Sequence, residues 1–137
     1  MGAKTNQSRN LSICNVTGAT ALFMLTLLAP LLKPAGTQDA DRGKTIFEKR
    51  CTGCHAVDID KEGPRLSGVF GRGAGSVPTF TYSDAVKTSG VTWDAAALDK
   101  WLTDPDAFIP DSNMAFRVAD AGERSAIIAY LKQISDK

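Results

Sequence analysis

Apolar residues recur every three or four positions along several stretches of the chain, which is the spacing of one face of a helix. In the last of these stretches, Ile127, Leu131 and Ile134 fall on one side. No stretch alternates between apolar and polar residues well enough to predict a strand, so the expected fold class is all-α. The helices that this pattern predicts span Asp41–Cys51, Ser83–Ser89, Trp93–Thr103 and Asp120–Ser135.

Residues at the ends of these segments support the predicted bounds. Thr92 is a suitable N-cap for the third helix, and Gly90 is a suitable residue to end the second. Between the helices, residues 55–82 and 104–113 are rich in Gly and Pro and show no usable period. A compact domain rarely contains such long loops unless they are functional. We therefore expect a large apolar group to order them.

The first 36 residues differ in composition from the rest of the chain. They contain three basic residues and no acidic one, and the stretch from Ala19 to Leu32 is mostly apolar. A basic start followed by an apolar run is typical of a secretory signal peptide. The sequence therefore predicts a signal peptide or N-terminal membrane anchor over residues 1–36 and one functional domain over residues 37–137. The expected location is the periplasm, with the leader cleaved or retained as a tether to the inner membrane.

The composition excludes several classes of function. Sixteen Lys and Arg against fifteen Asp and Glu leave a net charge of +1, which excludes a strongly basic nucleic-acid-binding protein. The predicted domain alone is slightly acidic, with thirteen basic and fifteen acidic residues. With three Cys and one His, the chain has barely enough ligands for a tetrahedral zinc site. Any hydrolase with a catalytic His would have to use His55.

That His ends the segment Cys51-Thr52-Gly53-Cys54-His55, which is the C-x-x-C-H haem attachment motif. Each thiol can add to a haem vinyl group, and the imidazole can then bind the iron. A thioredoxin-like pair would need a βαβ setting, a zinc knuckle would need a fourth ligand, and a disulfide between the two cysteines would close only a small loop. The motif therefore predicts one haem c, attached covalently through Cys51 and Cys54, with His55 as an axial iron ligand.

The second axial ligand follows by elimination. No other His is present, and Met1 and Met24 belong to the predicted leader. Met114 is the remaining Met, in a polar loop that contains a Pro. A lone Met more often fills a core, but this loop is a poor place for that role. The sequence therefore favours iron ligation by His55 and Met114.

Several ordered segments make the domain similar to mitochondrial-type class I cytochromes c. The similarity runs from Gly43 to Leu131 with few gaps and is more specific than the attachment motif alone. The matching segments are Gly43–Phe47, Cys51–His55, Gly63–Arg72, Phe80–Ala85, Val91–Trp93, Ile109–Phe116 and Ile127–Lys132.

The resemblance implies roles for residues outside the attachment motif. It implies that the Pro64 carbonyl accepts a hydrogen bond from His55, that polar side chains bind the haem propionates, and that Gly43 allows the first and last helices to cross. Two positions depart from the family, since Trp101 replaces a usual Tyr and Val86 replaces a frequent Asn. The further cofactor-binding residues implied are Pro64, Arg72, Tyr82, Trp93, Trp101 and Ser112. The expected pocket walls are Leu66, Phe70, Leu98, Trp101, Leu102, Phe116 and Ile128.

These features together predict a monomeric one-electron carrier rather than an enzyme. The resemblance implies redox partners of the respiratory chain, with a quinol:cytochrome c reductase or a dehydrogenase as donor and a terminal oxidase or reductase as acceptor. We expect only weak electrostatic steering, because the domain is slightly acidic. The alternatives are a haem subunit serving a dehydrogenase or peroxidase, and a gas-binding haem protein. Peroxidase or gas-binding function requires an open iron position, which Met114 would close.

Overall fold

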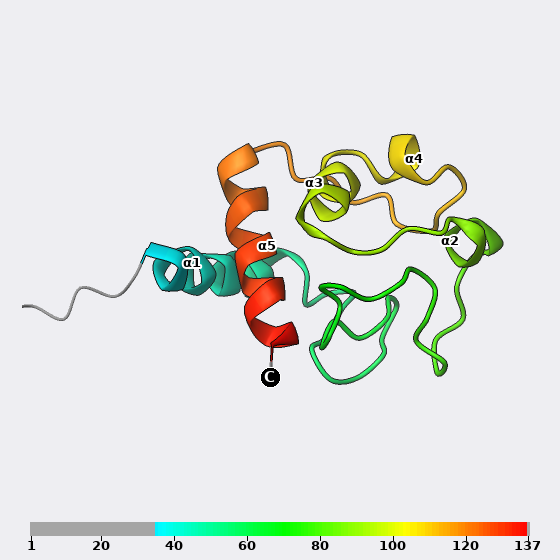
Figure 1. Cartoon of the computed structure of the whole chain (residues 1–137), viewed down its shortest axis with the longest axis horizontal. Coiled ribbons are helices and arrows are strands. Elements are labelled where there is room, and N and C mark those ends of the chain that lie inside the picture. The colour runs from blue at the N-terminus through cyan, green and yellow to red at the C-terminus, as the bar shows by residue number, and fades with distance from the viewer. Residues whose placement is uncertain (1–34, 137) are drawn as a thin grey trace, which may run out of the picture. The chain divides into compact units, whose positions relative to one another are not determined.

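The computed structural model describes residues 35–136, and Figure 1 shows the others in grey. The predicted signal peptide or membrane anchor over residues 1–36 falls almost entirely outside this range. Within the described range no helix is both long and apolar enough to cross a membrane. The helices are α1 (Ala35–Arg50), α2 (Asp84–Thr88), α3 (Ala95–Thr103), α4 (Pro105–Phe108) and α5 (Ala121–Ser135). No strand occurs among these residues, which confirms the all-α prediction.

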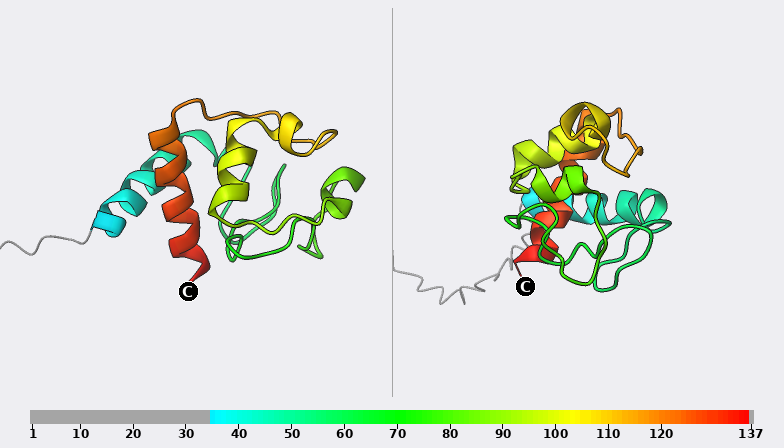
Figure 2. Two further views of the ribbon diagram at one scale, coloured as in Figure 1. Left: turned by 45° about the horizontal axis from the view of Figure 1, so that its top comes forward. Right: turned by 90° about the vertical axis from the view of Figure 1, so that its right-hand side faces the viewer.

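Helices α1 and α5 cross each other closely, as Figures 1 and 2 show. A side chain on Gly43 would overlap the backbone carbonyl of Ala126, so only Gly fits at the crossing. Beside it, the rings of Phe47 and Tyr130 pack with their centroids 5.3 Å apart. The first and last helices are therefore joined by direct backbone contact.

The starts of α3 and α5 reflect their capping residues. The carboxylate of Asp120 accepts a hydrogen bond from the Glu123 backbone at 2.7 Å, so α5 begins as predicted. The predicted N-cap of α3, Thr92, is wrong: Asp94 caps the helix by accepting from the Ala97 backbone at 2.7 Å. Thr92 instead forms an isolated antiparallel bridge with Gly73.

Two other segments contain more helix than the pattern predicts. Helix α1 begins at Ala35 rather than at Asp41, and Ala40 in the added turns is buried. Helix α4 lies in a segment predicted to have no regular structure. Its N-cap is Asp104 and its first residue is Pro105, a combination that suits a helix start. Four residues are too few to show a helical period.

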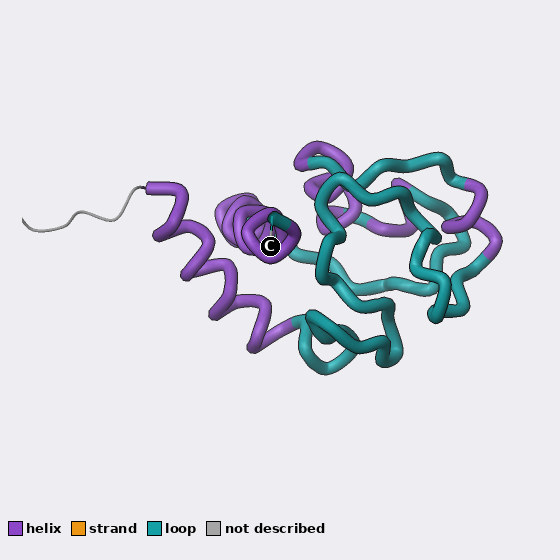
Figure 3. The backbone as a smooth tube through the Cα atoms, turned by 60° about the horizontal axis from the view of Figure 1, so that its bottom comes forward, coloured by secondary structure: helices purple, strands orange, loops and turns teal. Residues whose placement is uncertain are grey.

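The loops and short helices form a ring beside α5. Figure 3 shows the loops in teal on the side of α5 away from α1, and Figure 1 shows α3 and α4 above the loop that follows α1. Helix α2 lies at the end farthest from α5 (Figure 1). Residues from the loops, α2 and α3, together with some from α1 and α5, surround the interior described next.

Candidate functional site

A cavity of about 690 Å³ lies inside this ring of loops and helices. Its walls are mostly apolar, which is typical of pockets that enclose large cofactors. The apolar and aromatic residues that line it include Phe47, Leu66, Val69, Phe80, Val86, Trp93, Leu98, Trp101, Leu102, Phe116, Ile127 and Leu131. The long loops therefore surround a preformed space large enough for a bulky apolar group.

The two cysteines of the attachment motif lie at the wall of this cavity. The backbone continues for one turn after α1, since the Cys51 amide donates to Phe47 at 2.8 Å and the His55 amide donates to Cys51 at 2.8 Å. Both thiols are unpaired. Burial raises the pKa of the Cys51 thiol to about 11, although the nearby Arg50 charge acts in the opposite direction. This turn presents both sulfur atoms and the imidazole to one cavity.

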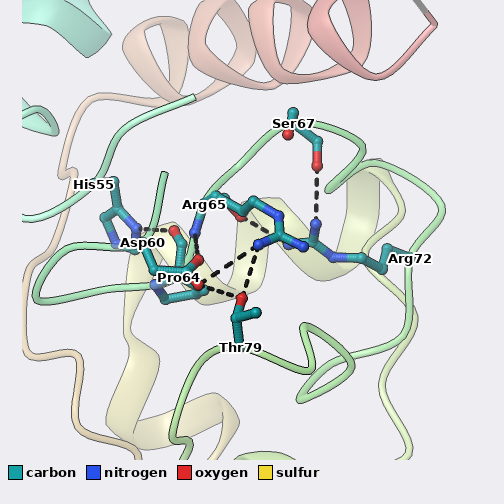
Figure 4. A network of polar contacts seen from close by, with 7 residues as sticks. All are labelled: His55, Asp60, Pro64, Arg65, Ser67, Arg72 and Thr79. Atoms are coloured by element: carbon teal, nitrogen blue, oxygen red, sulfur yellow. Dashed lines mark hydrogen bonds and ion pairs between the residues drawn. The ribbon is translucent and has the colours of Figure 1, made fainter. Parts of the chain in front are cut away.

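The imidazole of His55 is oriented by a backbone hydrogen bond. Its Nδ1 lies 2.9 Å from the Pro64 carbonyl oxygen (Figure 4). Because a carbonyl can only accept, Nδ1 carries the proton and Nε2 keeps the lone pair that a metal ion needs. Burial lowers the pKa of His55, and the bond to Pro64 opposes that shift only in part. The ring is therefore neutral and suited to metal binding at neutral pH.

The residue before Pro64 also holds the imidazole in place. A side chain on Gly63 would overlap the His55 ring. The Gly63 amide donates to the Cys54 carbonyl at 2.8 Å, which ties this loop to the attachment motif. The close approach of backbone to ring fixes the plane of the imidazole.

Met114 reaches the same cavity from the segment between α4 and α5. Asn113, Ala115 and Phe116 line the cavity beside it. On α3, Trp101 also lines the cavity, and its ring lies 5.3 Å from that of Trp93. The cavity is thus bordered by His55 and Met114, which are 59 positions apart in the sequence.

Two buried donors at the site lack a protein partner. Arg72 donates from Nη1 to the Ser67 carbonyl at 2.9 Å and from Nη2 to the Arg65 carbonyl at 3.0 Å, but its buried Nε has no acceptor. The buried hydroxyl of Ser112 has no partner either. Burial also lowers the pKa of the Arg72 guanidinium. Buried donors without partners are rare in native proteins, so both indicate a missing acceptor.

A haem fits these observations. It would fill an apolar cavity whose wall presents two thiols and a neutral imidazole, and its propionates would supply acceptors for buried donors such as Arg72 Nε. The zinc alternative has no support in residues 35–136, where no group of three or more His, Cys, Asp and Glu side chains could hold a metal ion. The residues present therefore match the cofactor that the motif predicts.

The structure brings together nearly all the predicted site residues. Those that line the cavity are Cys51, Cys54, His55, Pro64, Arg72, Tyr82, Trp93, Trp101 and Met114. Ser112 does not line the cavity. Its hydroxyl is buried, and the next residue in the sequence, Asn113, is part of the lining. Arg72 and Trp93 are joined through their backbones, since the Trp93 amide donates to the Arg72 carbonyl at 2.9 Å.

Two predicted wall residues do not line the cavity. The Lys132 ammonium lies 5.6 Å from the centroid of the Phe70 ring. The Phe70 amide donates to the Ser135 hydroxyl. Ile128 lies one position after Ile127, and that step turns its side chain about 100° around the helix, away from the cavity wall. Both residues pack against the core instead.

Some lining residues were not predicted from the sequence. Those with polar side chains are Arg50, Glu62, Thr81, Ser83 and Asn113. Thr81 and Ser83 flank Tyr82 in one extended segment, and Asn113 precedes Met114. Adjacency to a predicted site residue is the signal that could have identified four of them, whereas Glu62 lies two positions before Pro64 and has no such signal.

Comparison with known proteins supports this interpretation of the site. A family model described as cytochrome c matches residues 40–135. Cytochrome c2 of Blastochloris viridis is 42% identical over 118 residues, covering 83% of this chain and 92% of that protein. Cytochrome c2 of Rhodoplanes tepidamans is 43% identical over 100 residues, covering 70% and 92%.

A solved structure is similar as well. Cytochrome cH from Methylobacterium extorquens superposes with a TM-score of 0.66 at 41% sequence identity, covering 69% of this chain and 98% of that one. The matching family, the cavity and the attachment motif agree on a haem c bound covalently through Cys51 and Cys54. Such a protein carries electrons and is not an enzyme. The chain belongs to the cytochrome c family and is a class I c-type cytochrome.

Proposed function

We propose that this cytochrome carries single electrons between respiratory redox proteins with His55 and Met114 as its two axial iron ligands. The observation that carries the proposal is that both side chains line one cavity from distant segments. Haem c supplies the one-electron couple between ferric and ferrous iron. No other Met lies within residues 35–136, so this part of the chain offers one thioether for the second position.

The protein's own residues keep this site rigid and dry. The Pro64 carbonyl fixes the proton of His55 on Nδ1 and so keeps Nε2 directed at the metal. Apolar walls such as Trp93, Leu98 and Leu102 exclude water from the cavity. A thioether ligand and an apolar shell both favour the less charged ferrous state, so the reduction potential is expected to be high. Two ligands kept in both oxidation states require little rearrangement at each transfer.

The polar groups at the cavity suit the haem propionates. Arg72 is partly buried, and while its two Nη atoms donate to carbonyl groups, its buried Nε–H has no acceptor. Tyr82 and Trp93 line the same cavity, and Ser112 has a buried hydroxyl without a partner. These four residues would donate hydrogen bonds that allow buried carboxylates to stay charged.

Export supplies the setting for this function. The basic and apolar leader over residues 1–36 supports secretion to the periplasm, where residues 37–137 would act as a monomeric carrier or remain tethered by the leader. The donor would be a quinol:cytochrome c reductase or a dehydrogenase, and the acceptor a terminal oxidase or reductase. The mass of the mature protein would report leader removal and haem attachment together.

Substitution of Met114 tests the ligand assignment. Met114→Leu keeps the side-chain volume but removes the sulfur, and Met114→Ala removes both. We expect both variants to lose the sixth ligand and their ferrous forms to bind carbon monoxide more readily than the wild-type protein does. Absorption and resonance Raman spectra in both oxidation states would report the ligation. A five-coordinate wild-type iron would overturn the carrier assignment and favour the gas-binding or peroxidase alternative.

A further inference from the structure

The peptide unit that joins Pro64 to Arg65 is hydrogen bonded at both ends. Its carbonyl oxygen accepts from His55 Nδ1 at 2.9 Å, and its N–H donates to Asp60 Oδ1 at 2.8 Å. Figure 4 shows the dashed lines that link His55 to this peptide and this peptide to the Asp60 carboxylate. A single peptide group therefore connects the imidazole to a carboxylate that does not touch it.

The carboxylate of Asp60 is held in this orientation by a second bond. Thr79 donates from its hydroxyl to Asp60 Oδ2 at 2.5 Å, and Arg65 Nη1 donates to that hydroxyl at 2.8 Å (Figure 4). The Arg65 guanidinium also lies 3.6 Å from Asp60 Oδ2, and the Asp60 side chain is only 19% exposed. The Thr79 hydroxyl and the Arg65 amide lower the pKa of Asp60, so it is charged at neutral pH.

Peptide groups on both sides of this one are hydrogen bonded to other parts of the fold. Arg72 Nη2 donates to the Arg65 carbonyl at 3.0 Å, and the Leu66 amide donates to the Ala56 carbonyl at 3.0 Å. The Gly63 amide is held by Cys54. The Pro64–Arg65 peptide cannot turn away from either partner without breaking several of these bonds.

A carboxylate on the N–H of a peptide changes the other end of that peptide. Resonance couples the nitrogen to the carbonyl oxygen, so an anionic acceptor at the N–H makes the oxygen more negative. Hydrogen bonds that share a polarisable group strengthen one another, by roughly 10–30% per bond in condensed phases. A stronger acceptor on Nδ1–H makes the imidazole more electron-rich and a better ligand. A ligand that donates more electron density to the iron stabilises ferric iron more than ferrous iron.

We infer that Asp60 is a positioning residue that acts through the Pro64–Arg65 peptide to strengthen His55 as an iron ligand and lower the reduction potential. The inference rests on the proposed role of His55 as axial ligand. It gives Asp60, which lies outside the cavity lining, a function in setting the potential. Thr79 is part of the same device because it holds the carboxylate in place.

Three variants of the mature holoprotein separate the hydrogen bond from the charge. Asp60→Ala removes both, Asp60→Asn removes the charge but keeps an acceptor for the Arg65 amide, and Asp58→Asn removes an exposed charge in the same loop. We expect the equilibrium constant for reduction to rise about two- to tenfold in Asp60→Ala, or about 20–60 mV at ~59 mV per decade. Asp60→Asn should give a smaller rise and Asp58→Asn almost none.

NMR spectroscopy separates the bonded path from a through-space effect of the charge. Salt cannot do so alone, because about 0.5 M salt strongly screens an exposed charge such as Asp58 but screens Asp60, which is 19% exposed, much less. In the reduced protein, the NMR signals of the His55 Nδ1 proton and the Arg65 amide proton should both move upfield in Asp60→Ala. Thr79→Val should shift the potential in the same direction, and Thr79→Ser, which keeps the hydroxyl, should restore the wild-type value.

The outcomes separate this inference from the function on which it rests. An unchanged potential in Asp60→Ala, with the wild-type ligation spectrum intact, would overturn the role of Asp60 alone. A shift in Asp58→Asn equal to that in Asp60→Asn would do the same. A wild-type spectrum without His ligation would overturn the proposed function. If Asp60→Ala does not mature, Thr79→Val against Thr79→Ser decides the question.

Discussion

At the scale of single residues, the site is marked by groups that the polypeptide alone leaves unsatisfied. A buried donor without an acceptor costs about 1–3 kcal/mol. Arg72 Nε and the Ser112 hydroxyl are both in this condition, although neighbouring polar groups of the same loops are paired. The same Arg72 side chain also holds the loop that carries Pro64. One guanidinium can therefore serve the cofactor and the peptide that orients His55.

Gly63 offers a direct test of how the His55 ring is held. We expect Gly63→Ala to force the imidazole away from the Pro64 carbonyl, because the added methyl group would overlap the ring. Loss of a partner that orients a metal-binding His typically reduces metal affinity about 10- to 100-fold. The yield of holoprotein, measured by absorbance and mass, should fall by at least about tenfold.

The attachment motif provides the matched control for that substitution. A side chain on Gly53 would meet no atom within 4 Å, so Gly53→Ala should mature like the wild type. Equal yields from the two variants would show that the contact between Gly63 and the imidazole does not orient the ring.

At the scale of elements, the crossing of α1 and α5 depends on one position. Gly43→Ala would place a methyl group against the Ala126 carbonyl and the Tyr130 side chain. Overpacking of this kind costs about 1–3 kcal/mol, and here it would separate the first helix from the last. We expect the free energy of unfolding of the holoprotein, measured in guanidinium chloride, to fall by that amount.

In protein that retains residues 1–36, Gly36 on the same helix is the control for the crossing, compared with Gly43→Ala in the same form. It has no neighbour within 4 Å of an added methyl group, so Gly36→Ala should leave stability unchanged within about 0.5 kcal/mol. A loss in Gly36→Ala as large as in Gly43→Ala would mean that the general properties of α1, rather than the backbone contact, set the cost.

The elements could be predicted where their signals lie close together in the sequence. Helix α5 begins within one residue of the prediction because its cap at Asp120 and its apolar stripe are both local. The start of α3 could not be predicted, since Thr92 and Asp94 are both suitable caps. What decides between them is the bridge from Thr92 to Gly73, a pairing between distant residues. Helix α4 is too short to produce a period.

The same distinction applies to the candidate site. The attachment motif is contiguous, so the sequence alone predicts the cofactor and the residues that anchor it. Which residues form the cavity wall depends on which side of a helix or loop faces inward. The sequence predicts Ile128 as a wall residue, but its neighbour Ile127 lines the cavity instead. The role of Asp60 has no local signature, because it depends on a peptide bond four residues later and on Thr79.

At the scale of the whole molecule, the basic residues near the site are largely neutralised. Arg50, which lines the cavity, forms an ion pair with Glu123. Lys87 lies 3.2 Å from Asp84, and Arg65 lies near Asp60. The predicted domain also carries more acidic than basic residues. A partner with an acidic docking surface would therefore meet little unpaired positive charge at these positions.

This charge pattern predicts a shallow salt dependence of electron transfer. Strong electrostatic steering raises association rates by about 10- to 1,000-fold and is lost as ionic strength rises. We expect the second-order rate with an acidic oxidase, measured by stopped flow from about 0.05 to 0.5 M salt, to fall by less than about tenfold.

Glu123→Gln leaves Arg50 without its acidic partner beside the cavity, so this variant should react faster at low salt and lose more of its rate as salt increases. Asp84→Asn, which releases Lys87 on α2, tests whether the effect is confined to the cavity edge. A steep loss of rate in the wild-type protein, unaltered by Glu123→Gln, would contradict the assignment of weak steering to these ion pairs.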